Sequence, residues 1–293
     1  MTEGDPIVDA FEEQRPHLRA VAYRMLGSTG EADDAVQEAW LRLSRNDPEE
    51  IENLGGWLTT VVARICLNML RSRNSRREQS LDDLHMPDPI VDPLDGTDPE
   101  HEALLGDSIG IAMLMVLETL NPAERLAFVL HDMFGVPFEE IAPIVDRSPD
   151  ATRQLASRGR RRLRAADPVP DADLDQQRQV VEAFIAAARE GDFDRLVNVL
   201  HPDVVLRADY GPDAEAVEVR GAEAVIARAR SFATIGAEGH MVRVNGGIGT
   251  VAFLDGKPIS VGAVQIRAGR IVAIDFLADP ARLAQLDLGR LAG

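Results

Sequence analysis

Six arginines crowd one short stretch of the chain, and their placement is that of a nucleic-acid-binding helix. They fall within residues 149–164, against a single acid. Arginine can pair with guanine and glutamine with adenine, and side chains near the start of a recognition helix reach base edges. Arg153 and Gln154 have that position, whereas Arg158 and Arg161 are better placed for phosphates. The alternative is an ordinary charged surface helix, but most of these arginines lack an acid four residues away in the stretch.

A second basic group lies on and after a helix that is predicted to begin with Trp57 and to run to about Arg73. Its cations are Arg64, Arg71, Arg73, Arg76 and Arg77. Arginines supply phosphate contacts with release of counterions, and an aromatic ring nearby can stack on an exposed base. The alternative is a solvated helix end whose arginines complement the helix dipole, with Trp57 in the core.

Residues 31–44 predict a helix with two unlike faces. One face is apolar and carries Ala32, Ala35, Val36, Ala39, Trp40 and Leu43. Acidic and polar residues lie largely off that face: Asp33, Asp34, Gln37, Glu38 and Arg42. Such a stripe is either solvated surface or a docking face for another protein, and the residues alone favour neither.

The composition predicts a folded protein of two or three domains. The chain has 293 residues, 45% of them hydrophobic, with 49 acids against 31 bases and a net charge of −18. That total argues against a nucleic-acid partner, but eight of the acids and no base fall in residues 81–105, beside four prolines. Proline interrupts regular structure and like charges extend a chain, so this stretch is predicted to be an inter-domain linker.

The remaining global features predict a soluble cytoplasmic protein. The single cysteine, Cys66, excludes an internal disulfide and fits a reducing compartment. The N-terminus lacks the basic and apolar regions of a signal peptide, and no apolar run approaches the roughly 20 residues that span a bilayer. The histidines show no metal-ligand spacing, so neither a metal nor a cofactor is predicted.

Local signals place helices on both sides of the linker. Asp5-Pro6 and Asn121-Pro122 each pair a capping residue with proline at the first helical position. Residues 138–145 predict a short helix, followed by a turn at Asp146-Arg147 and a basic helix that starts at Ser148-Pro149. Two short helices joined by a tight turn, the second one basic, form the helix-turn-helix pattern.

The last part of the chain predicts an α+β domain with a largely antiparallel sheet. One or two helices over residues 174–200 precede five runs of β-branched residues, and a helix at about 221–233 interrupts them. Asp255-Gly256 between two such runs predicts a tight hairpin. The glycine-rich residues 245–249 are followed by strand-like residues, so a turn is favoured there over a phosphate loop.

Polar residues on or beside these strands are candidates for a pocket. They are Arg207, Asp209, Tyr210, His240, Arg243 and Asp275. The alternative, which we favour from the residues alone, is that they are outward-facing polar positions of alternating strands.

Taken in order, these features resemble a bacterial RNA polymerase sigma factor of the extracytoplasmic-function group. Residues 31–43 resemble the family's core-polymerase-docking helix, residues 55–78 its promoter-melting and −10-reading helix, and residues 120–164 its −35-reading domain. The third part is similar to the SnoaL-like domains, of the nuclear-transport-factor-like cone fold, that one subgroup carries at its C-terminus.

The resemblance implies two all-α sigma domains, the second with a helix-turn-helix, and a C-terminal α+β cone domain. The implied boundaries are 1–80 for sigma region 2, 81–105 for the acidic proline-rich linker, 106–166 for sigma region 4 and 173–293 for the SnoaL-like domain. Two subgroup motifs resemble residues of this chain. The linker's Trp-Leu-Pro-Glu-Pro is similar to His85–Pro89, and the C-terminal Asn-Pro-Asp-Lys-Leu is similar to Asp279–Leu283.

The implied function is promoter-specific transcription initiation, with no catalysis by the sigma domains. The implied partners are core RNA polymerase, promoter DNA and, within the chain, a contact between the C-terminal and sigma domains; no membrane contact is implied. The polymerase-docking residues would be Asp34, Gln37, Glu38, Leu41 and Arg42. The downstream element would meet Trp57, Arg64, Asn68, Arg71, Arg73, Arg76 and Arg77, and the upstream element Arg153, Gln154, Arg158 and Arg161.

The role of the third domain stays open between two hypotheses. It is either a regulatory module that biases the sigma domains, or an isomerase- or cyclase-like enzyme or binding module for an unknown small ligand. A third hypothesis, a ligand-sensing regulator that uses only the helix-turn-helix, leaves residues 1–80 unexplained.

Overall fold

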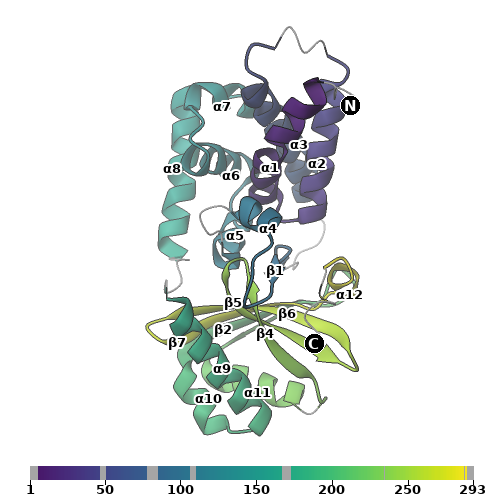
Figure 1. The fold of residues 1–293 in the computed structure, drawn as a ribbon. Coiled ribbons are helices and arrows are strands. Elements are labelled where there is room, and N and C mark those ends of the chain that lie inside the picture. The colour runs from purple at the N-terminus through teal and green to yellow at the C-terminus, as the bar shows by residue number, and fades with distance from the viewer. Residues whose placement is uncertain are drawn as a thin grey trace, which may run out of the picture. The chain divides into compact units, whose positions relative to one another are not determined.

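The computed structural model describes residues 6–46, 51–77, 85–105, 110–166, 173–233, 235–286 and 288 (Figure 1). The chain divides into two compact units. The first comprises residues 1–80, 99–107 and 113–168, and the second comprises residues 81–98, 108–112 and 169–293. No helix within these described ranges is both long and apolar enough to cross a membrane.

The first unit begins with three helices whose ends follow local signals. They are α1 (Pro6–Leu26), α2 (Thr29–Leu43) and α3 (Leu54–Arg77). α1 ends at Gly27, whose φ of +69° lies in the left-handed region that glycine tolerates best. The Ser28 hydroxyl then caps α2 by accepting a hydrogen bond from the Glu31 amide at 3.3 Å. The predicted helices are confirmed, and their apolar faces pack on one another.

Cys66 lies on the buried face of α3, as the sequence predicts for an inert thiol, and burial raises its pKa to about 12. Because the thiolate is the reactive form, we expect no reaction with a disulfide reagent at about pH 8 in the folded protein, and rapid reaction in denaturant. Absorbance of the released chromophore measures both. If the native protein were modified stoichiometrically as fast as the denatured protein, Cys66 would not be buried in solution.

The rest of the first unit carries the predicted helix-turn-helix. Its helices are α4 (Pro99–Leu105), α5 (Ile111–Glu118), α6 (Pro122–Phe128), the π-helical turn η2 (Val129–Met133), α7 (Phe138–Val145) and α8 (Pro149–Ala166). The Asn121 side chain accepts a hydrogen bond from the Glu124 amide at 2.9 Å and so caps α6. Asp146, with a φ of +57°, makes the turn between α7 and α8.

Two buried arginines tie the helices of the first unit together. Arg24 donates to the carbonyls of Leu104 and Leu105 at 3.0 and 2.8 Å. Arg125 donates to the carbonyl of Arg24 at 3.1 Å and to the Glu118 carboxylate at 2.6 Å. These bonds link the end of α1 to α4 and α6, and they satisfy carbonyls at the C-terminal end of α1 and of α4 that have no partner within their own helix.

The second unit is built on a seven-stranded sheet in the order β1-β4-β5-β6-β7-β2-β3. The strands are β1 (Val91–Asp92), β2 (Leu200–Asp209), β3 (Val217–Arg220), β4 (Glu238–Val244), β5 (Gly247–Leu254), β6 (Lys257–Arg267) and β7 (Arg270–Leu277). Neighbours are antiparallel except for β2 and β7, which are parallel. A short helix, α12 (Pro280–Leu283), follows the sheet.

Three helices cover one face of this sheet: α9 (Leu174–Glu190), α10 (Phe193–Val199) and α11 (Ala222–Ala233) (Figure 1). The core between the layers includes Val181, Leu196, Val204, Val225 and Ile274. The α+β prediction is therefore confirmed. The hairpin predicted at Asp255-Gly256 joins β5 and β6, and the glycine-rich turn joins β4 and β5.

Part of the segment predicted to be an extended linker is instead built into the second unit. Residues 91–92 form the edge strand β1 on β4. The Met86 and Ile90 amides each donate at 2.9 Å, to Asp209 and to the side chain of Asn245. Met86 and Ile90 are buried. The count of acids and prolines hid this outcome, because it takes no account of the apolar side chains and backbone amides that bind the segment to the sheet edge.

Candidate nucleic-acid interface

The basic helix α8 has a buried side that fixes its orientation. Thr152, Ala156, Gly159 and Leu163 form this side. At Gly159, a β-carbon would lie 3.1 Å from the β-carbon of Phe128, so a larger side chain would push α8 away from α6. The arginines predicted to contact DNA therefore lie on the flanks and the outward face of α8.

On one flank of α8, Arg153 and Arg160 form ion pairs with acidic residues, and Arg153 also contacts an aromatic ring. Arg153 pairs with Asp150 at 2.6 Å, and its guanidinium carbon lies 5.2 Å from the centroid of the Phe138 ring. Arg160 pairs with Asp132 at 3.2 Å. Partial burial raises the pKa of Asp132, and the charge of Arg160 opposes that shift.

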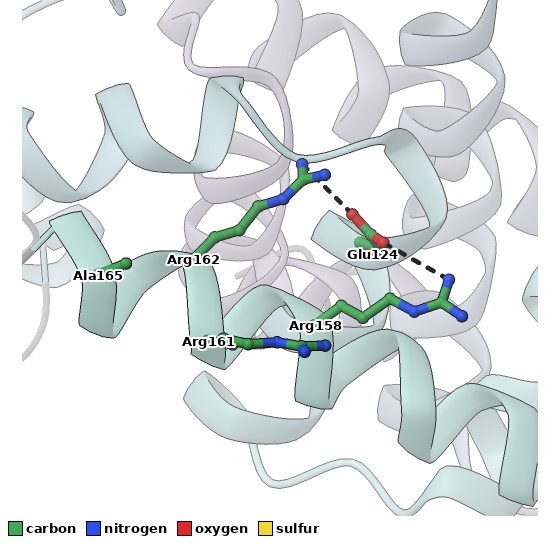
Figure 2. Close-up of a pocket in the computed structure, with 5 residues that line it drawn as sticks. All are labelled: Glu124, Arg158, Arg161, Arg162 and Ala165. Atoms are coloured by element: carbon green, nitrogen blue, oxygen red, sulfur yellow. Dashed lines mark ion pairs between the residues drawn. The ribbon is translucent and has the colours of Figure 1, made fainter.

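On the other flank, Glu124 faces a cavity of about 320 Å³ (Figure 2). Its carboxylate is 3.8 Å from Nη1 of Arg158 and 3.5 Å from Nη1 of Arg162. Arg161 and Ala165 complete the lining. The Glu124 side chain is only 4% exposed, whereas both paired arginines are half-exposed.

The outward face of α8 carries Gln154 and Arg161, both exposed. Within the described part of the chain, Arg161 and Arg164 make no ion pair. α8 therefore presents two unpaired guanidiniums, while Arg153, Arg158, Arg160 and Arg162 each have an acidic neighbour. Within the stretch itself, the sequence shows an acid near Arg153 only. The other partners come from α6 and η2, which spacing along α8 does not reveal.

The basic group on α3 likewise contains both exposed residues and an arginine that is paired within the protein. Arg64, Asn68 and Arg71 lie one helical turn apart on the exposed side of α3, and Trp57 is half-buried near its start. Arg73 departs from the expectation. Its side chain is 15% exposed, donates to the carbonyl of Leu26 at 3.1 Å and pairs with Glu31. Its guanidinium is occupied within the protein, so we remove it from the DNA-facing set.

Two further members of that group, Arg76 and Arg77, end α3, and their side chains lie outside what the structure describes.

The polar stripe of α2 lies on the surface as expected. Asp34, Gln37, Leu41 and Arg42 are exposed, and Glu38 pairs with Arg42 at 2.9 Å. Leu41 within this stripe is 41% exposed. A single exposed leucine is normal on a protein surface, so the assignment of the stripe as a docking face rests on the family resemblance.

The six candidate pocket residues lie in several local environments. Arg207 pairs with Asp275 at 2.9 Å, and Asp275 also accepts a hydrogen bond from Gln265 at 2.8 Å. Burial raises the pKa of Asp275, and the charge of Arg207 opposes that shift without cancelling it. These three side chains form one polar cluster on β2, β6 and β7.

The other four candidate residues contact different parts of the protein. Tyr210 accepts a hydrogen bond from Arg228 at 2.6 Å, and Arg243 donates to Thr97 at 3.0 Å. The His240 ring packs edge-on to Phe253, with the centroids 5.4 Å apart. The fourth, Asp209, belongs to the clasp described next. The candidates therefore do not converge on one site.

The two subgroup motifs meet at Arg282, where they form what we call the Arg282 clasp. Its Nε donates to Asp88 at 2.8 Å, its Nη1 to Asp209 at 2.8 Å and its Nη2 to the carbonyl of Met86 at 2.5 Å. Asp279 caps the helix that carries Arg282 by accepting from the Ala281 amide at 2.9 Å. The clasp joins the segment before β1 to the end of β2 and to α12.

Sequence reasoning missed the acids that organise these sites. Glu118, Glu124 and Asp132 belong to ordinary helical stretches, and nothing in their spacing singles them out. One local signal existed at Glu124, because it is the third residue after the Asn121 cap and so lies in the first turn of α6. Its arginine partners are more than thirty residues away in sequence.

Three family models match the chain. Sigma-70 region 2 matches residues 10–76, Sigma-70 region 4 matches residues 111–163, and a SnoaL-like domain matches residues 181–274.

Two relatives extend the match over almost the whole chain. The chain is 38% identical to the ECF RNA polymerase sigma factor SigJ of Mycobacterium tuberculosis strain H37Rv, over 93% of this chain and 92% of that protein. It is 36% identical to the probable ECF sigma factor SigI of the same species, over 98% of each. The crystal structure of SigJ superposes with a TM-score of 0.77 at 34% identity, covering 96% of this chain and 99% of the other.

Proposed function

Because this chain belongs to the extracytoplasmic-function sigma factors of RNA polymerase, we propose that its α8 surface reads the upstream promoter element. The observation that carries this proposal is the outward face of α8. Gln154 and Arg161 lie there, free to meet base edges and phosphates, while the buried side holds the helix on α6.

We also assign the two remaining surfaces of the sigma domains. The exposed row Arg64, Asn68 and Arg71 on α3, with Trp57 near its start, engages the downstream element as it opens. Arg76 and Arg77 at the end of α3 remain in this proposed set. The α2 stripe around Leu41 docks on core polymerase.

For the C-terminal domain we propose a regulatory role, exerted through contact with the sigma domains. The supporting observation is the Arg282 clasp, which holds part of the segment between the two sigma regions on this domain's sheet. The domain is thereby coupled to the chain that connects the two DNA-reading regions. An Arg282→Ala variant with unchanged promoter-dependent transcription would contradict this role.

A second candidate for the C-terminal domain is catalysis on, or binding of, a small ligand. The observation that favours it is the Arg207–Asp275–Gln265 cluster. It holds a buried carboxyl group whose pKa is raised by burial, as in sites that transfer a proton. Conversion or binding of small apolar compounds that disappears in Asp275→Asn, with transcription intact, would favour this candidate over regulation.

The proposed reading surface predicts a specific loss in Arg161→Gln. Reconstituted with core polymerase, this variant should initiate transcription about 5- to 10-fold less from a responsive promoter. The slope of its log affinity for promoter DNA against log salt concentration should be shallower by about 1. The matched control is Arg178→Gln, which removes the same charge from an exposed position on α9. Equal activity of the wild type and Arg161→Gln would refute the assignment.

A further inference from the structure

Glu124 occupies an unusual position for an acid in a DNA-binding domain. Its carboxylate is almost fully buried beneath the basic helix, yet its two guanidinium partners stay half-exposed. Both N–O distances, 3.5 and 3.8 Å, exceed those of good hydrogen bonds. In the described structure, Oε2 is buried and has no hydrogen-bond partner.

The cavity beside Glu124 has the charge of an anion site. Three arginines, Arg158, Arg161 and Arg162, contribute to its lining together with a single acid, Glu124 (Figure 2). Its volume of about 320 Å³ is many times the roughly 30 Å³ that one water occupies. A second anion of phosphate size would meet a positive excess there, weakened by the carboxylate in the wall.

The two arginines paired with Glu124 lie where their guanidiniums could exchange the carboxylate for a DNA phosphate. Arg158 and Arg162 are one turn apart on the flank of α8, next to the proposed reading face. Arg162 is anchored further, because it donates to the carbonyl of Thr119 at 2.8 Å. Arg158 has only the long contact to Glu124 among the ion pairs of the described residues. Arg158 is therefore the cation that Glu124 alone restrains.

We propose that Glu124 is a positioning residue: its carboxylate acts as an internal counter-anion that holds the guanidiniums of Arg158 and Arg162. The cavity beside it then accepts a backbone phosphate of bound DNA. This inference rests on the proposed function of α8. Glu124 weakens DNA binding in two ways: it competes with the phosphate for the two guanidiniums, and it repels the phosphate. The acid thereby limits the sequence-independent part of binding, which supplies affinity but no specificity.

The test is Glu124→Gln in the full-length chain, bound to a labelled duplex of about 30 base pairs of arbitrary sequence. Between roughly 20 and 200 mM salt, each added phosphate contact steepens the slope of log affinity against log salt by about 0.9. We expect a slope steeper by about 1 to 2 and a 5- to 30-fold higher affinity near 0.1 M salt. Arg158→Gln should cost little in the wild type and several-fold more in the Glu124→Gln background.

The matched control is Glu140→Gln, which removes the same charge from an exposed position on α7. Unchanged or weaker DNA binding by Glu124→Gln, an equal gain in the control, or additive effects of Glu124→Gln and Arg158→Gln would each overturn the proposal. A purely structural role would move the melting temperature without changing the salt slope. If Arg161→Gln lowers promoter-dependent initiation while Glu124→Gln changes nothing, the inference fails and the proposed function stands; if Arg161→Gln has no effect, the proposed function itself fails.

Discussion

Replacing Arg282 with alanine is expected to release residues 85–98 from the C-terminal sheet domain. The substitution removes every donor of the Arg282 clasp and leaves the carboxylates of Asp88 and Asp209 without their guanidinium. Both acids are buried, and Asp209 keeps the Met86 and Gly211 amides as donors, so we expect loss of the guanidinium to cost about 1–3 kcal/mol. The edge strand β1 is short, with two residues, and cannot hold the segment by itself.

Two measurements test this expectation. Limited proteolysis should cut within residues 85–98 much faster in Arg282→Ala than in the wild type, and the thermal unfolding of the C-terminal domain should shift to lower temperature. The matched control is Arg270→Ala, which removes an exposed arginine from the start of β7 in the same domain. Equal cleavage rates in Arg282→Ala and wild type would show that other contacts hold the segment.

The second large effect is expected from Arg125→Met. The Arg125 side chain is 2% exposed, pairs with Glu118 at 2.6 Å and donates to the carbonyl of Arg24 at 3.1 Å. Methionine keeps much of the length but provides no donor, so the largely buried Glu118 carboxylate loses its short contact. We expect a loss of about 3–5 kcal/mol, or a melting temperature roughly 10 °C lower for the sigma-like unit.

A double variant separates this cause from simple loss of packing. If the cost comes from loss of the short ion pair, Arg125→Met with Glu118→Met should be more stable than Arg125→Met alone. The double variant no longer buries a carboxylate whose ion pair with Arg73 is long, at 4.0 Å. Differential scanning calorimetry of the full chain follows the transition. A double variant less stable than the single one would mean that Arg125 acts through packing, and would contradict the prediction.

Much of the fold was predictable because its signals are local. The Ser28 and Asn121 caps bond amides only three residues away, and the Asp255-Gly256 turn is set by two positive φ angles. Helix periodicity and strand alternation likewise act within a few residues. Such interactions form wherever the same short sequence occurs, so reading along the chain finds them.

The candidate interface was predictable only in part. The exposure of Arg64, Asn68, Arg71, Gln154 and Arg161 agrees with the expectation drawn from helix position. Arg73 does not, because it turns inward to Glu31. Its helical position is equally suited to solvent and to a neighbouring helix, and the neighbour is known only once the chain has folded.

The amino-acid order therefore established the helix-turn-helix, the α+β domain and the basic helix that carries six arginines. Tertiary structure alone decided which of those charges are free. Glu124 and Asp132 reach α8 from other helices, and Arg282 reaches Asp88 across 194 positions of the chain. The reason is that the energy of an ion pair depends on the distance in space between the two charged groups. The separation of two residues along the sequence does not determine that distance.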